Sequence, residues 1–233
     1  WVTAMMMFMV SFWGLSRLTI ERDAPVAHST SLVDQLVAGF RHLLGRSDLR
    51  LLLALTALNG LLGRTIIELL PALSGQLLQG GSAELAVLVA MAGLGSVLGG
   101  LLLSRQAADL ARLMVLVCAA IALAGLALIG LQWFAGLVGL ALWVSILSVV
   151  TTLAGTGSQT LIQLTTSAEY RGRVMSVWTM LAMGAPALGA ALLGAGVDGF
   201  GFSRVAVWTG GVGVVLVISL YARRSRVLAG NNP

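Results

Sequence analysis

The chain has 233 residues, of which 58% are hydrophobic and only 10% are charged. Its mean hydropathy is +0.96. A soluble domain carries about 25% charged residues, so this composition excludes a soluble globule and predicts a chain surrounded by lipid over most of its length. The net charge of +5 comes from arginine alone, since the chain contains no lysine. The arginines lie in short segments between apolar runs, which indicates a basic membrane face and not a nucleic-acid-binding surface.

The N-terminal region predicts two different kinds of structure. Residues 1–15 are almost wholly apolar and lack the positive start and small-residue cleavage site of a signal peptide. We therefore expect them to form the tail of a transmembrane helix that begins before Trp1. Residues 16–50 should form a cytoplasmic connection, in which apolar residues at helical spacing from Leu32 to Leu44 predict an amphipathic helix on the inner membrane surface. A solvated linker is the alternative.

The rest of the chain divides into runs long enough to cross a bilayer, for which roughly 20 helical residues are needed. Residues 113–168 carry no charge. As one helix they would extend about 84 Å, so we expect a hairpin of two helices with its turn near Gln132 and Gly136. Six spans are therefore predicted within residues 51–222, followed by a tail of residues 223–233; the apolar runs are 51–70 (closed by Pro71), 85–103, two within 113–168, 174–197 and 205–222.

The arginines predict the orientation of these spans. Twelve of them flank the spans on one side and only Arg204 lies on the other, and such an excess marks the cytoplasmic side. We expect a multi-pass protein of the cell membrane with a cytoplasmic C-terminus. The twelve are Arg17, Arg22, Arg41, Arg46, Arg50, Arg105, Arg112, Arg171, Arg173, Arg223, Arg224 and Arg226.

Three segments resemble a known family. Residues 40–53 (FRHLLGRSDLRLLL) resemble the entry to the seventh helix of major facilitator superfamily transporters, in the branch of the enterobactin exporter and macrolide efflux proteins. Residues 170–176 (YRGRVMS) resemble that branch's signature between helices ten and eleven, and residues 183–189 (MGAPALG) its eleventh helix. The resemblance implies an all-α membrane protein whose six-helix bundle is the C-terminal half of a twelve-helix fold. It implies a secondary transporter that exports small amphiphilic molecules by proton exchange and alternating access, with an N-terminal bundle as partner.

The resemblance also points to three candidate gating arginines. Arg171 and Arg173 belong to the signature segment, and Arg105 ends a stretch that resembles the start of the superfamily's loop motif. In that motif an aspartate occupies the place of Ser104. A gating salt bridge at this loop would therefore need Asp109, and the loop would have to bend back.

Two ionisable residues lie inside the first predicted span. Charged groups in a membrane cost about 2.5–3.5 kcal/mol on insertion scales and by default indicate function. Arg64 and Glu68 are four residues apart and can pair on one helix face. With Asn59, near mid-membrane, Arg64 is predicted to lie on the substrate pathway, and Glu68 is the candidate for proton coupling. The alternative is a purely structural ion pair.

The fourth predicted span carries a polar stripe at steps of three or four residues. Two glutamines cannot face lipid without partners, so the stripe predicts the wall of a wet cavity on the substrate pathway. Hydrogen bonding between packed helices is the alternative. The stripe consists of Ser145, Ser148, Thr152, Thr156, Gln159 and Gln163.

Glycine and proline predict two further features. Gly95 and Gly99 form a GxxxG pair, which is typical of close helix packing. Pro186 lies between Gly184 and Gly189 and should bend the fifth span, either as a hinge or to shape the bundle.

Other chemistry lacks the residues that it would need. The two histidines, His28 and His42, have no metal-ligand spacing, and the single cysteine, Cys118, cannot form a disulfide within this chain. We therefore expect no enzyme, no cofactor, no metal and no nucleic acid. The expected partners are a small-molecule substrate, the lipid bilayer and the N-terminal bundle. A membrane scaffold or assembly subunit is the main alternative, and a channel a weaker one because no ring of charged residues is evident.

Overall fold

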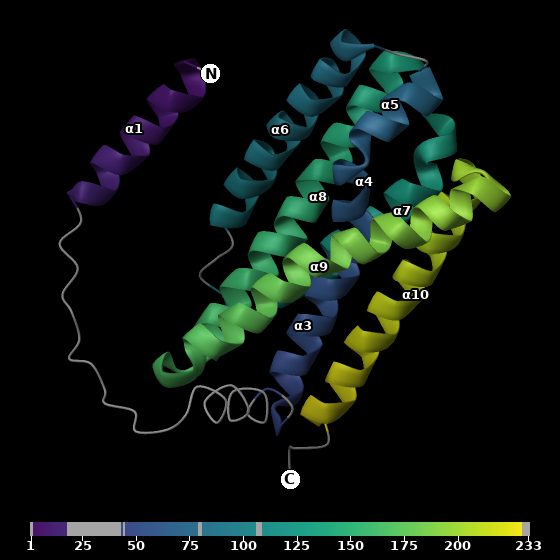
Figure 1. The fold of residues 1–233 in the computed structure, drawn as a ribbon. Helices are drawn as coiled ribbons and strands as arrows, with labels where there is room; N and C mark the ends of the chain where they lie inside the picture. The colour runs from purple at the N-terminus through teal and green to yellow at the C-terminus, as the bar shows by residue number, and fades with distance from the viewer. Residues whose placement is uncertain (1, 18–42, 44, 79–80, 106–108, 230–233) are drawn as a thin grey trace. The chain divides into compact units, whose positions relative to one another are not determined.

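The computed structural model describes residues 2–17, 43, 45–78, 81–105 and 109–229 (Figure 1). Within these ranges the elements are helices and no strand occurs. Helix α1 (Val2–Ser16) is a separate unit. Its large apolar side chains are exposed, with Phe8 80% accessible, as expected of a helix that contacts lipid. The surface helix predicted over residues 32–44 lies, apart from residue 43, outside the described part.

In the described part of the chain, six apolar helical segments are long enough to cross a membrane, which confirms the all-α six-helix bundle. They are Ser47–Glu68, Ser82–Ser104, Leu110–Trp133, Gly136–Thr165, Ala168–Val197 and Phe202–Ala222. The elements that make them up are α3 (Ser47–Asn59), the π-helical turn η1 (Gly60–Arg64), α4 (Thr65–Glu68), α6 (Ser82–Ser104), α7 (Leu110–Gly130), the short 3₁₀ helix η2 (Leu131–Trp133), α8 (Gly136–Thr165), α9 (Ala168–Phe200) and α10 (Phe202–Ala229).

Some helix boundaries differ from the expected ones. The first span begins at Ser47. Just before it, the Arg46 guanidinium forms an ion pair and a hydrogen bond with the Asp48 carboxylate, and this hydrogen bond raises the pKa of Arg46. Pro71 does not end helical structure. The break falls at Leu69, and Pro71 lies in the first turn of α5 (Leu70–Leu78), where a missing N–H is tolerated. Helix α10 continues to Ala229, so the predicted tail from residue 223 starts as helix.

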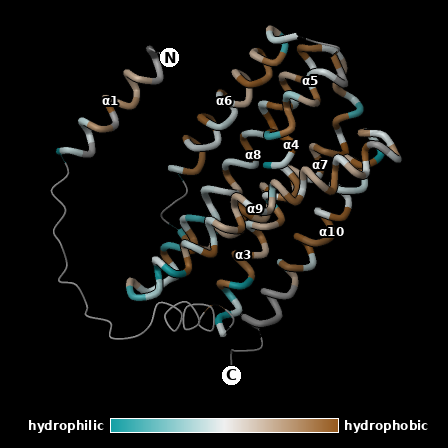
Figure 2. The backbone as a smooth tube through the Cα atoms, viewed as in Figure 1, coloured by the Kyte–Doolittle hydropathy of each residue, from teal (hydrophilic) through white to brown (hydrophobic). Residues whose placement is uncertain are grey.

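The first span, α7 and α8 form the centre of the bundle. In each of them 56% of the apolar segment is buried, against 22% for α6 and α9 and 28% for α10. Helix α8 packs along both α6 and α7, and the Trp143 indole N–H donates to the Ala127 carbonyl at 2.7 Å. The helices are hydrophobic over most of their length, and hydrophilic residues occur near several helix ends and also at α4 in the middle of the bundle (Figure 2).

The GxxxG pair is used inside the bundle. A Cβ on Gly95 would collide with the Ser145 carbonyl of α8, and one on Gly99 would lie 2.7 Å from the Val149 carbonyl. The two glycines therefore let the backbones of α6 and α8 approach closely, which is the close packing that the motif predicts.

Candidate functional site

A cavity of about 370 Å³ lies between the first span, α8 and α9. Helix α6 contributes Ser96 to its wall. The cavity brings together six of the eight residues predicted for the substrate pathway, and these come from two helices that are far apart in sequence. They are Asn59, Arg64, Ser148, Thr152, Thr156 and Gln159.

The two ends of the polar stripe do not line this cavity. Ser145 lies where α8 meets Gly95 of α6, and Gln163 is exposed. Residues 145 and 163 are about 27 Å apart along the helix at 1.5 Å per residue. The stripe is therefore longer than the cavity, and only its middle part faces the first span and α9.

The first span departs from α-helical geometry beside the cavity. Gly60 begins the π-helical turn, and its carbonyl accepts hydrogen bonds from both the N–H and the hydroxyl of Thr65, the latter at 2.8 Å. A Cβ on Gly60 would lie 2.8 Å from that of Ala185, and one on Gly63 would collide with the Thr151 side chain. The turn therefore lies against both α9 and α8, and π-helical turns of this kind are frequent at functional sites.

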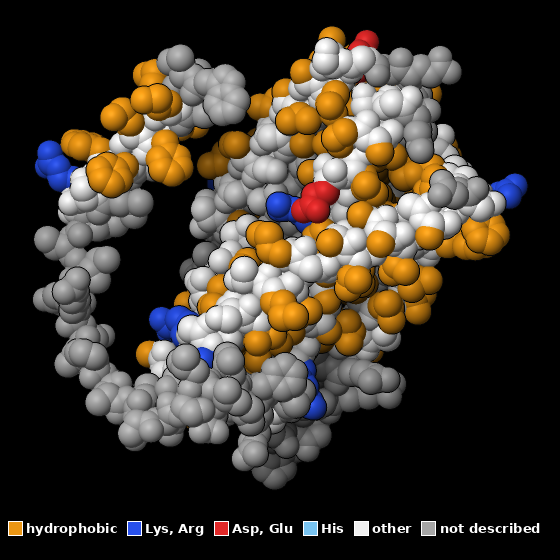
Figure 3. Space-filling model, in the orientation of Figure 1, with side chains coloured by type: hydrophobic (Ala, Val, Ile, Leu, Met, Phe, Trp, Pro, Cys, Tyr) orange, Lys and Arg blue, Asp and Glu red, His pale blue; other side chains and the backbone are white. Residues whose placement is uncertain are grey.

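The predicted ion pair is present. The Arg64 Nε and a Glu68 carboxylate oxygen lie 3.2 Å apart, with the side chains 58% and 47% exposed. Arg64 lines the cavity, whereas Glu68 does not. In the space-filling view a cationic and an anionic side chain lie side by side in the middle of the face, among hydrophobic and uncharged side chains (Figure 3).

The three residues predicted as a hinge have different surroundings. Helix α9 runs without interruption through Pro186, whose carbonyl accepts a hydrogen bond from the Thr65 hydroxyl at 3.2 Å. A Cβ on Gly189 would collide with Thr65, so α9 and α4 touch there. A Cβ on Gly184 would meet nothing within 4 Å. Close packing therefore explains Gly189 but not Gly184.

Sequence reasoning missed several residues of the cavity wall. Trp178 and Met183 of α9 look like ordinary apolar residues of a membrane helix, and Thr151 lies one residue off the stripe. Ala182 also lines the wall, and its carbonyl has no helical partner because Pro186, four residues later, has no N–H. In the sequence, Pro186 was the only feature that pointed to this part of the cavity wall. The missed residues are Thr56, Gly60, Ile67, Ser96, Thr151, Gly155, Trp178, Ala182 and Met183.

Two of the candidate gating arginines contact residues of their own segment. Arg171 donates to the Thr166 carbonyl at 3.5 Å, and the Arg173 guanidinium lies over the Tyr170 ring, 5.6 Å from its centre. Arg105 follows the last residue of α6 and is exposed.

Asp109 caps the N-terminus of α7. Its carboxylate accepts from two backbone N–H groups there and pairs with Arg112 at 3.2 Å. The structure thus does not bring Asp109 to Arg105 as a gating pair, because the cap and the ion pair occupy its oxygens.

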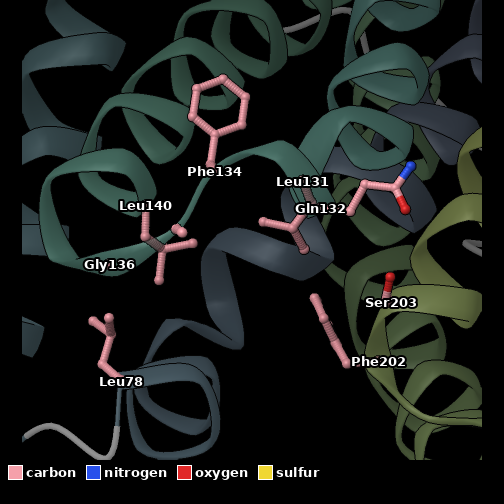
Figure 4. A pocket seen from close by; sticks show the side chains of 9 residues that line it. Leu78, Leu131, Gln132, Phe134, Gly136, Leu140, Phe202 and Ser203 are labelled. Carbon is pink, nitrogen blue, oxygen red and sulfur yellow. The ribbon is translucent and has the colours of Figure 1, made fainter.

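A second cavity, of about 250 Å³, lies where η2 turns into α8 (Figure 4). Apolar side chains such as Phe134 and Leu140 form much of its wall, and Gln132 and Ser203 are its polar side chains. The larger cavity has many more polar groups and is therefore the better candidate site. Over the described ranges, no cluster of three His, Cys, Asp or Glu side chains could hold a metal ion.

Comparison with known proteins places the chain in a family. The sequence profile of the transmembrane secretion effectors matches residues 1–230. No curated protein sequence matches the chain. The six apolar helices have the length and composition of membrane spans. The chain therefore belongs to the transmembrane secretion effector family of the major facilitator superfamily, whose members are membrane transporters.

Proposed function

We propose that this membrane transporter exports small amphiphilic molecules, of the drug or siderophore class, by alternating access in exchange for protons. The six-helix bundle is the C-terminal half of a twelve-helix transporter in the cell membrane, with its C-terminus in the cytoplasm. The substrate lies in the cavity between the first span, α8 and α9, where an N-terminal bundle covers it.

The cavity is the observation that supports this proposal most directly. At about 370 Å³ it is as large as the pockets that bind small ligands. Its wall combines hydroxyl and amide groups from α8 with apolar groups such as Met183 and Ile67. Such a wall suits a molecule with one polar and one apolar part. If these polar groups only held packed helices together, they would be hydrogen-bonded across the helix interface and no cavity would lie between them.

Contacts beside the cavity support alternating access. The π-helical turn and Pro186 each interrupt regular helical hydrogen bonding, and they meet through the Thr65 hydroxyl. Helices bend at such points. Bending of the first span and α9 about this contact would open or close the cavity.

The ion pair supports proton exchange. Glu68 is the only acidic residue between Asp48 and Glu84, and its partner Arg64 is the charged residue that lines the cavity. A substrate that enters the cavity meets Arg64 and can disturb its pair with Glu68, which makes Glu68 the candidate for proton coupling. The GxxxG pair gives no support to the scaffold alternative, because Gly95 and Gly99 pack α6 against α8 of the same chain instead of against a partner helix.

Transport of Nile red, an uncharged fluorescent amphiphile, tests the proposal. The protein is expressed in cells without their own multidrug exporters, and dye efflux is followed after energisation, with and without a protonophore. Thr152→Leu and Thr156→Leu, which make the cavity wall apolar, should slow efflux to the rate of cells without the protein. The control Gln163→Leu makes a similar change on the same helix outside the cavity and should leave efflux unchanged. Equal rates in cells with and without the wild-type protein would contradict export of this class, and efflux insensitive to the protonophore would contradict proton exchange.

A further inference from the structure

Three buried polar atoms of the cavity residues have no hydrogen-bond partner. Over the described residues, only four buried side-chain nitrogen or oxygen atoms are unpaired: Asn59 Oδ1, Ser148 Oγ, Trp178 Nε1 and Ser74 Oγ. The first three belong to side chains that line the same cavity. Each unpaired buried group costs about 1–3 kcal/mol, and native proteins contain few of them. Their gathering at one cavity therefore indicates a function.

Other polar groups of the same wall are satisfied within their own helices. The Thr56 hydroxyl donates to the Leu52 carbonyl at 2.9 Å, and the Thr151 hydroxyl to the Ser148 carbonyl at 3.3 Å. The Asn59 amide nitrogen donates to the Thr151 carbonyl at 3.4 Å. That bond orients the amide and leaves its oxygen as the free acceptor.

The positions of the three side chains limit where a partner can come from. Asn59 is 7% exposed and Ser148 1%, so protein surrounds them on every side except the cavity wall. The three atoms are themselves covered in this conformation, so their side chains must turn toward the cavity before a molecule there can bond to them. Together they offer an acceptor from Asn59, a donor from Trp178 and a hydroxyl that can do either.

The charge of the cavity indicates that this partner is uncharged. Arg64 is the charged residue among those that line it, and Glu68 pairs with Arg64 at 3.2 Å. Glu68 lies outside the wall but compensates the charge of Arg64, so the cavity and its immediate surroundings have no net charge for an ionic group. Amide and hydroxyl groups are neutral and both donate and accept hydrogen bonds.

We propose that Asn59, Ser148 and Trp178 recognise an uncharged polar group of the substrate that both donates and accepts hydrogen bonds, such as a primary amide or a hydroxyl. This inference rests on the proposed function and adds the substrate feature that the cavity selects. An amide N–H donates to Asn59 Oδ1, and the amide oxygen accepts from Trp178 Nε1. Ser148 completes the site from α8.

Matched amphiphiles with a ten-carbon chain test the proposal. Binding of radiolabelled decanamide to the purified transporter is measured in competition with N,N-dimethyldecanamide, decanoate and decyltrimethylammonium. The dimethyl compound keeps the carbonyl but has no N–H donor, so it should bind roughly five- to tenfold more weakly than decanamide, the effect of one hydrogen bond. Both ions should also bind more weakly than decanamide.

Two variants assign the two hydrogen bonds to their residues. Asn59→Leu should abolish the difference between the two amides, because only decanamide uses the Asn59 oxygen. Trp178→Phe keeps the ring but loses the N–H, and should weaken both amides by a similar factor. The control Gln163→Leu should change neither. The Asn59→Leu comparison is a ratio of two ligands in one preparation, and the Trp178→Phe comparison uses dissociation constants, so a lower folded yield alters neither.

Other outcomes separate this inference from the proposed function. Equal binding of the two amides to the wild-type protein, or tighter binding of either ion, would overturn the recognition site while leaving export of amphiphiles intact. Failure of all four compounds to bind would overturn the recognition site and the proposed function together.

Discussion

The two glycines beside Pro186 should respond in opposite ways to the same substitution. Gly184 and Gly189 lie in one helix and were predicted as parts of one hinge. A Cβ at position 189 collides with the Thr65 hydroxyl and lies 3.2 Å from the Leu61 carbonyl, whereas a Cβ at position 184 meets nothing within 4 Å. Gly189→Ala should therefore destabilise the protein, and Gly184→Ala should stabilise it.

The structure sets the size of both effects. Overpacking a close contact costs typically 1–3 kcal/mol, and replacing a helical glycine by alanine returns about 0.5–1 kcal/mol. Gly189→Ala should thus cost about 1–2 kcal/mol net, while Gly184→Ala should gain about 0.5–1 kcal/mol. At roughly 2–4 °C per kcal/mol for a chain of this size, the Tm should fall by about 2–8 °C in the first variant and rise by about 1–4 °C in the second.

The single cysteine provides the assay. Cys118 is buried, so a dye that fluoresces on reaction with a thiol reports its exposure as the purified protein is heated. Thr65→Ala removes the hydroxyl that a Cβ at position 189 would strike. Adding Gly189→Ala to Thr65→Ala should therefore cost almost nothing, although Thr65→Ala by itself lowers the Tm through its lost hydrogen bonds to Gly60 and Pro186. An equal fall in Tm for Gly189→Ala in both backgrounds would refute the contact, and an equal response of the two glycines would refute the packing that distinguishes them.

Three further predictions concern topology, access and coupling. In a cysteine-free background, a cysteine at Ser82 should react with an impermeant thiol reagent added to intact cells and one at Ala229 should not; labelling at Ala229 would reverse the orientation that the arginines predict. A cysteine at Thr156 should be modified by small hydrophilic reagents and protected by Nile red, whereas one at the buried Leu153 should stay unmodified; equal reactivity would leave only the explanation by helix packing. Glu68→Gln should abolish efflux driven by a pH gradient while dye binding persists, and unchanged gradient-driven efflux per folded molecule would remove Glu68 from the coupling mechanism.

The sequence by itself determined the membrane class, the six spans and the pairing of Arg64 with Glu68. These follow from local properties: the length of an apolar run against the thickness of a bilayer, and the spacing of two side chains along one helix. The polar stripe of α8 could be recognised for the same reason. Local patterns did not predict that the first span passes through a π-helical turn at Gly60, or that a new helix begins at Leu70 with Pro71 in its first turn.

Only the tertiary structure decided which parts of these helices meet. The stripe could be seen in the sequence, but its division into cavity wall and outlying ends depends on where the first span and α9 cross α8. Trp178 has no polar signal in the sequence and gains its place only because α9 brings it to the cavity lined by Asn59 and Ser148. Helical periodicity shows which residues share a face, whereas the neighbour of that face depends on close contacts between distant helices, such as that of Gly189 with Thr65.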